Sequence, residues 1–61
     1  MDSKEIIKIL KQNGFIFRSQ KGSHKKFVKD DRTVIIPEHG KKDIPMGTLK
    51  NIEKQSGIKL K

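Results

Sequence analysis

The chain has 61 residues, of which 15 are Lys or Arg and 7 are Asp or Glu, so its formal net charge is +8. This length predicts a single domain, residues 1–61, with a small core, and the absence of cysteine excludes both a disulfide framework and a thiolate zinc site. No apolar run approaches the roughly 20 residues of a membrane helix, and the cationic excess favours a nucleic acid or another anionic partner.

The first predicted element is a helix over residues 3–13. Its apolar residues recur at helical spacing on one stripe: Ile6, Ile7, Ile9 and Leu10. Asp2 or Ser3 can cap the start of this helix. Asn13 and Gly14 then predict its end, because glycine adopts the left-handed conformation without steric cost.

Three strands are predicted next, over residues 15–19, 23–29 and 33–36. The first two form a hairpin around a turn at 20–22, where Gly22 supplies a permissive backbone. The third strand is β-branched throughout, which indicates partial burial on both of its faces.

A second helix is predicted to begin after Pro45 and to end at Gly57. Leu49 and Ile52 form its buried stripe. The order is therefore α-β-β-β-α, in the α+β class. We expect a three-stranded antiparallel sheet with two helices on one face and the other face open.

Side-chain alternation predicts where a central histidine points. Phe27 is the only large aromatic of the second strand, so its face is expected to join the core with the two phenylalanines of the first strand. His24 and Lys26 then point to the opposite, exposed face, beside Arg18 of the first strand. A register shift of one residue would reverse this prediction.

His24 lies in a strongly cationic stretch. Five cations occur within twelve residues, and no Asp or Glu separates them: Arg18, Lys21, Lys25, Lys26 and Lys29. Histidine exchanges protons near neutrality, since its ordinary pKa is about 6.5. A proton-transfer group among cations indicates binding of a phosphate backbone or chemistry on it. The candidate nucleic-acid-binding residues around His24 are Arg18, Lys21, Gly22, Ser23, Lys25 and Lys26.

Two short motifs resemble those of the HicA toxin family. The first is Gly22-Ser23-His24 followed by Phe27, and the second is Pro37-Glu38-His39 followed by the segment 45–49, Pro-Met-Gly-Thr-Leu. The resemblance covers nearly the whole chain. It implies a fold similar to a double-stranded-RNA-binding domain and a ribonuclease that cuts mRNA and arrests translation. It also implies that His24 is the catalytic residue.

The same resemblance implies the partners. These are mRNA as substrate and a HicB-type antitoxin protein that covers the histidine, with no membrane. We expect a cytoplasmic protein with no cofactor and no metal. The position of His39 makes it one candidate proton donor to the leaving group, and a loop residue with no catalytic part is the simpler interpretation.

Two other classes of function fit part of the pattern. A non-catalytic RNA-binding module of similar fold would explain the charge, size and order of elements equally well. A DNA-binding regulator is less favoured, because the whole sheet separates the two predicted helices and leaves no helix-turn-helix pair.

Overall fold

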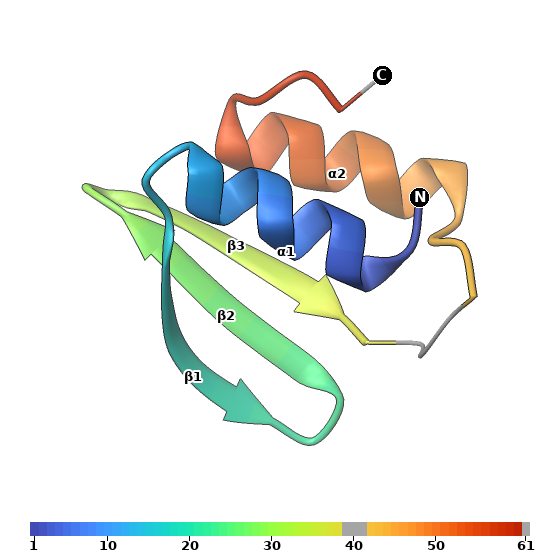
Figure 1. Cartoon of the computed structure of the whole chain (residues 1–61), viewed down its shortest axis with the longest axis horizontal. Helices are drawn as coiled ribbons and strands as arrows, with labels where there is room; N and C mark the ends of the chain where they lie inside the picture. Colours follow the sequence, from blue (N-terminus) through green and yellow to red (C-terminus); the bar gives the residue numbers. More distant parts are fainter. Residues whose placement is uncertain (39–41, 61) are drawn as a thin grey trace.

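The computed structural model describes residues 1–38 and 42–60. The chain folds in the predicted order α-β-β-β-α, and Figure 1 shows the path of the chain. The elements are α1 (Ser3–Gln12), β1 (Ile16–Lys21), β2 (His24–Lys29), β3 (Arg32–Pro37) and α2 (Met46–Ser56). The strands form one antiparallel sheet in the order β1-β2-β3, so the predicted α+β fold is confirmed.

The two ends of α1 follow from local hydrogen bonds. The Asp2 carboxylate accepts a hydrogen bond from the Glu5 amide at 2.9 Å, which satisfies a free N–H of the first turn. Gly14 has φ +92° and lets the chain leave the helix. Ile6 and Leu10 of the predicted apolar stripe are completely buried.

The second helix also agrees with its sequence signals. Pro45 precedes the first turn of α2, and Gly57 closes the helix with φ +74°. Leu49 and Ile52 are buried as predicted. Leu60 returns to the same core, so the segment after α2 packs onto the body of the protein.

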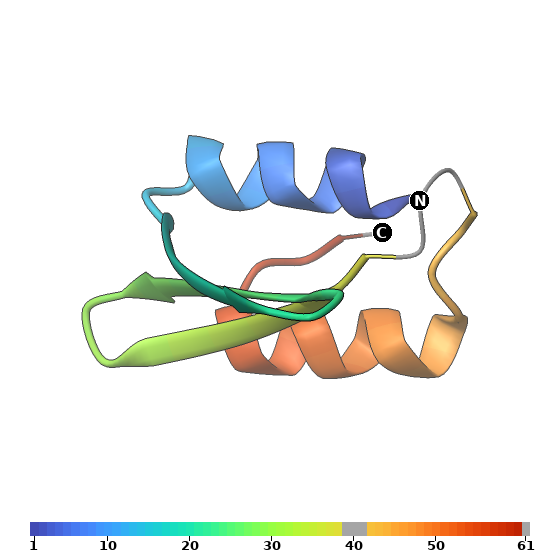
Figure 2. The ribbon, with the colours of Figure 1, turned by 90° about the horizontal axis from the view of Figure 1, so that it is seen from below.

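One face of the sheet forms the core and the other stays open. Phe27, Val34 and Ile36 lie on the buried face, where they pack with Ile6 and Leu10 and with the apolar side of α2. Figures 1 and 2 show α1 in a separate layer on one side of the sheet, running roughly along the direction of β3, and α2 running beside β3. Both helices therefore contribute to the single core on the Phe27 side.

The burial predicted for Phe17 is wrong, although its face is correct. Phe17 pairs with Phe27, and their rings meet edge to face at 5.8 Å between centroids. Phe17 nevertheless remains 50% exposed, whereas Phe15, just before the strand, is buried. The reason is that β1 is the outer strand, on the side of the sheet away from α2, where the helices do not cover it.

The first hairpin turn also differs from the prediction. Strand β1 continues to Lys21, and the turn consists of Gly22 and Ser23, so β2 begins at His24. The backbone of Gly22 has φ +60°, which explains the glycine there.

Neither helix of the described residues combines the length and the apolar character that a membrane span requires.

Candidate functional site

His24 is the first residue of β2 and lies on the open face of the sheet. It pairs with Lys21 of β1 and with Pro37 of β3. Phe27, three residues later, points to the core, so strand alternation places the His24 side chain on the other side. The predicted exposure of His24 is therefore confirmed.

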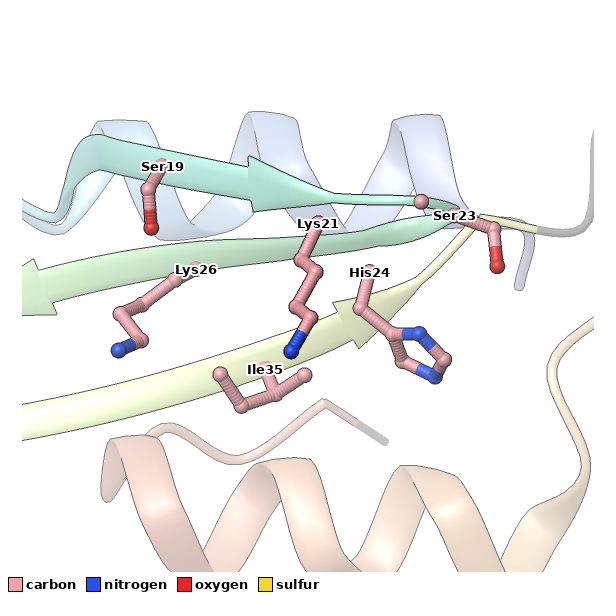
Figure 3. Close-up of a pocket in the computed structure, with 7 residues that line it drawn as sticks. Ser19, Lys21, Ser23, His24, Lys26 and Ile35 are labelled. Carbon is pink, nitrogen blue, oxygen red and sulfur yellow. The ribbon is translucent and has the colours of Figure 1, made fainter.

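A surface hollow surrounds His24 on this open face. Seven residues line it, from both strands of the first hairpin, from its turn and from β3: Ser19, Lys21, Gly22, Ser23, His24, Lys26 and Ile35. Figure 3 shows that the side chains of Lys21, His24 and Lys26 extend to the same side of the sheet, over Ile35. The hollow thus combines one imidazole with two ammonium groups above an apolar floor.

The charged side chains that line the hollow are all positive. None of its lining residues is acidic. Lys21 and Lys26 make no ion pair with any carboxylate of the described residues. An anion that enters the hollow therefore meets two cations that are not already neutralised by a partner. Such a site is suited to a phosphate group.

Two hydrogen bonds, one from a side chain and one from the backbone, hold the turn next to His24. The Gln20 side-chain amide donates to the Gly22 carbonyl at 2.9 Å, which braces the turn. The Glu38 amide donates to the Ser23 carbonyl at 2.7 Å. The turn and the residue that follows β3 are therefore fastened together, and this fixes the backbone from which His24 projects.

Four of the predicted neighbours come together with His24, and two do not. Lys21, Gly22, Ser23 and Lys26 line the hollow. The expectation that Arg18 lies beside His24 is wrong, because β1 has an irregularity between Phe17 and Ser19 that leaves Arg18 without a partner in the ladder.

Lys25 lies on the opposite face of the sheet from His24. It pairs with Gln20 and Ile36, and Ile36 is a core residue. Its ammonium group forms an ion pair with the Glu38 carboxylate at 3.2 Å. Lys25 and Lys26 are neighbours in sequence, yet only Lys26 shares the hollow with the imidazole.

Sequence reasoning did not identify Ser19, Ile35 or Glu38 as part of this region. Ser19 faces the hollow only because of the irregularity in β1, and the alternation of residue types does not encode that irregularity. Ile35 could have been found from strand alternation. It lies two residues before Pro37, which pairs with His24, so Ile35 is on the same face of the sheet as His24. His39 lies outside the described residues. Within residues 1–38 and 42–60, no group of three His, Asp or Glu side chains could hold a metal ion.

Comparison with known proteins agrees with the motifs and the fold. The model of the family described as HicA toxin of bacterial toxin–antitoxin systems matches residues 3–58. A protein of Pseudomonas fluorescens (strain Pf0-1), named as a probable mRNA interferase HicA, is 37% identical over 59 residues. The matched region covers 97% of this chain and 98% of that relative.

Proposed function

Since this chain belongs to the HicA toxin family of bacterial toxin–antitoxin systems, we propose that it cuts mRNA through His24, without a metal ion, and so arrests translation. By its family and its likeness to the named mRNA interferase, the chain is an endoribonuclease. The observation that carries the role of His24 is its position on the open face, in a hollow whose lining contains no acidic residue and whose two lysines make no ion pair with the described residues.

RNA supplies the nucleophile for this reaction. The 2′-hydroxyl attacks the adjacent phosphorus, the bond from phosphorus to the 5′-oxygen breaks, and a 2′,3′-cyclic phosphate and a 5′-hydroxyl result. Neutral His24 takes the proton of the 2′-hydroxyl as general base, a contribution of about 10²–10⁴-fold in rate. The leaving 5′-oxygen receives a proton from a second donor or from water.

The lysines of the hollow contribute electrostatically. Negative charge increases on the non-bridging phosphate oxygens as the attacking oxygen approaches. Lys26 lies on the same strand and the same face as His24, so its ammonium group can offset this charge without a change in the fold.

The partner that silences the enzyme is a HicB-type antitoxin bound to the open face of the sheet, in the cytoplasm. The exposed apolar surface beside the hollow supports a protein partner, because Ile16 is 62% exposed and pairs with Val28 on that same face. The neighbouring lysines favour an acidic partner surface. Substitution Ile16→Asp is expected to weaken this complex.

The decisive experiment compares wild type and His24→Ala on a defined mRNA, with and without a chelator. The His24 side chain is exposed and makes no hydrogen bond with the described residues, so its loss is expected to change the free energy of unfolding by less than about 0.5 kcal/mol. We expect wild type to cut with the chelator present and His24→Ala to bind RNA without cutting it.

The outcomes separate the catalytic function from its alternative. If wild type freed from any partner binds RNA and leaves it intact, the chain is a non-catalytic RNA-binding module. If cleavage stops when the chelator is added, the metal-free mechanism is wrong. If His24→Ala cuts as fast as wild type, another residue is the base.

A further inference from the structure

The irregularity in β1 determines which residues of that strand face His24. Phe17 pairs with Phe27, but the next paired residue of β1 is Ser19, opposite Lys26. Arg18 is the extra residue of a β-bulge. An uninterrupted ladder would have placed Arg18 opposite Lys26.

Beyond the bulge, the ladder places a different cation in the site. Gln20 pairs with Lys25, and Lys21 pairs directly with His24. If Arg18 were instead paired opposite Lys26 in an uninterrupted ladder, Gln20 would stand opposite His24, and Lys21 would fall in the turn. The bulge therefore moves Lys21 out of the turn and next to the imidazole, on the same face of the sheet.

Paired residues of neighbouring strands have side chains close enough to contact one ligand together. Lys21, Ser19 and His24 all line the hollow. In Figure 3 the Lys21 side chain reaches over Ile35 between those of Lys26 and His24. Its ammonium group pairs with no carboxylate of the described residues.

We propose that Lys21 is a catalytic residue that contacts the scissile phosphate beside His24, that Ser19 donates a hydrogen bond to the same phosphate, and that Arg18 serves only as the bulge residue. This inference rests on the proposed function of His24. During the reaction, His24 accepts the 2′-hydroxyl proton while the ammonium group of Lys21 donates hydrogen bonds to a non-bridging oxygen. Lys21 neither gains nor loses a proton in the step.

The first test compares Lys21→Ala, Lys21→Arg and the matched charge removal Arg18→Ala. A charge-assisted hydrogen bond to a phosphate corresponds to about a 10- to 150-fold change. We therefore expect Lys21→Ala to lower the single-turnover cleavage rate at saturating enzyme by about this factor, and Arg18→Ala to change it by less than about 3-fold.

Single-turnover rates separate this role from a structural one. All three substitutions are of exposed side chains, so thermal unfolding is expected to be unchanged. Lys21→Arg retains the charge and is expected to restore most of the rate. Equal losses in Lys21→Ala and Arg18→Ala would mean that only the total charge counts, and the inference would then be wrong.

A second test removes the bulge itself. Deletion of Arg18 leaves Ser19, Gln20 and Lys21 with their present partners in a regular ladder. We expect a folded deletion variant to keep cleavage within about 10-fold of wild type, since all the lining residues remain. Loss of cleavage in a variant that melts normally would assign a direct role to Arg18 and overturn the inference.

The failure of this inference is distinguishable from the failure of the proposed function. If Lys21→Ala cuts normally while His24→Ala is inactive, only the role of Lys21 is refuted. If His24→Ala retains the wild-type rate, the mechanism based on His24 is refuted whatever Lys21 does. Should the deletion variant fail to fold, Arg18→Ala still decides whether the Arg18 side chain takes part.

Discussion

The adjacent residues Lys25 and Lys26 provide a direct test of the site geometry. They have the same charge and neighbouring positions, but they lie on opposite faces of β2. Lys25 forms an ion pair with Glu38, and Lys26 lines the hollow beside His24. We expect Lys25→Ala to affect stability and Lys26→Ala to affect cleavage.

The stability loss expected for Lys25→Ala follows from the partly exposed ion pair of Lys25. The two side chains are 26% and 37% exposed and 3.2 Å apart. Solvent screens such a pair, so its loss costs about 0.2–1 kcal/mol of unfolding free energy. In a domain of this size 1 kcal/mol lowers Tm by about 4–8 °C, so we expect a decrease of roughly 1–8 °C.

The loss of cleavage expected for Lys26→Ala follows from the contact that Lys26 can make with RNA. Its side chain is exposed and has no ion pair among the described residues, so stability is expected to stay within about 0.5 kcal/mol of wild type. A hydrogen bond from an ammonium group to a phosphate is worth about 1.5–3 kcal/mol, which corresponds to a roughly 10- to 150-fold loss in kcat/KM.

Both variants are assayed by thermal unfolding and by cleavage of one RNA over a range of salt concentrations. For a single strand, each phosphate contact contributes about 0.7 to the slope of log affinity against log salt, so Lys26→Ala is expected to reduce this slope by that amount. The slope of Lys25→Ala is expected to match wild type. The reverse pattern, with Lys25→Ala impaired in cleavage and Lys26→Ala normal, would show that the register of β2 is wrong.

Three further predictions concern the fold that supports the site. Phe27→Ala is expected to lower the free energy of unfolding by about 3–5 kcal/mol. Phe17→Ala is expected to lower it by only about 1–2 kcal/mol, because half of the Phe17 side chain is already exposed. Equal losses for the two variants in denaturant unfolding would contradict the edge position of β1. Asp2→Ala is expected to cost about 1 kcal/mol through the loss of the helix cap, while Asp2→Asn is nearly neutral; identical melting curves for the two would argue against the cap. Gly57→Ala is expected to lower the free energy of unfolding by about 1–2 kcal/mol, because Gly57 has a positive φ. The control Gly47→Ala lies inside α2 with open space around it, so it is expected to raise the free energy of unfolding by about 0.5–1 kcal/mol. Stabilisation by both substitutions would mean that the left-handed helix end is absent.

Much of the fold could be predicted from residue patterns, because each pattern has one strong physical cause. The isoleucine stripe of α1 must face a core, and the alternation around Phe27 must send His24 to the other face. A single buried aromatic therefore determined on which face of the sheet His24 lies. Gly14 and Gly57 ended their helices as predicted, since both have positive φ.

The predictions that failed depend on features that residue alternation does not encode. A bulge inserts one residue without changing the apolar pattern, so Arg18 was predicted at the position that Ser19 occupies. The exposure of Phe17 depends on how far the helices extend over the sheet, which is a property of the assembled domain. Both errors fall in β1, an edge strand that lies away from α2, whereas the other edge strand, β3, has α2 beside it.

The order of the strands also has a kinetic consequence. The most extensive contacts join β1 with β2, β2 with β3, and β3 with α2, all of which follow one another in the chain. Because short loops close at little entropic cost, such a topology is expected to refold within about milliseconds to a second, and a much slower main phase in stopped-flow refolding would contradict this. A newly made chain would then be able to cut RNA almost as soon as it leaves the ribosome. If a HicB-type antitoxin silences the chain as proposed above, protection of the cell would depend on antitoxin that is already present, because rapid maturation of the toxin would leave no interval in which to make it.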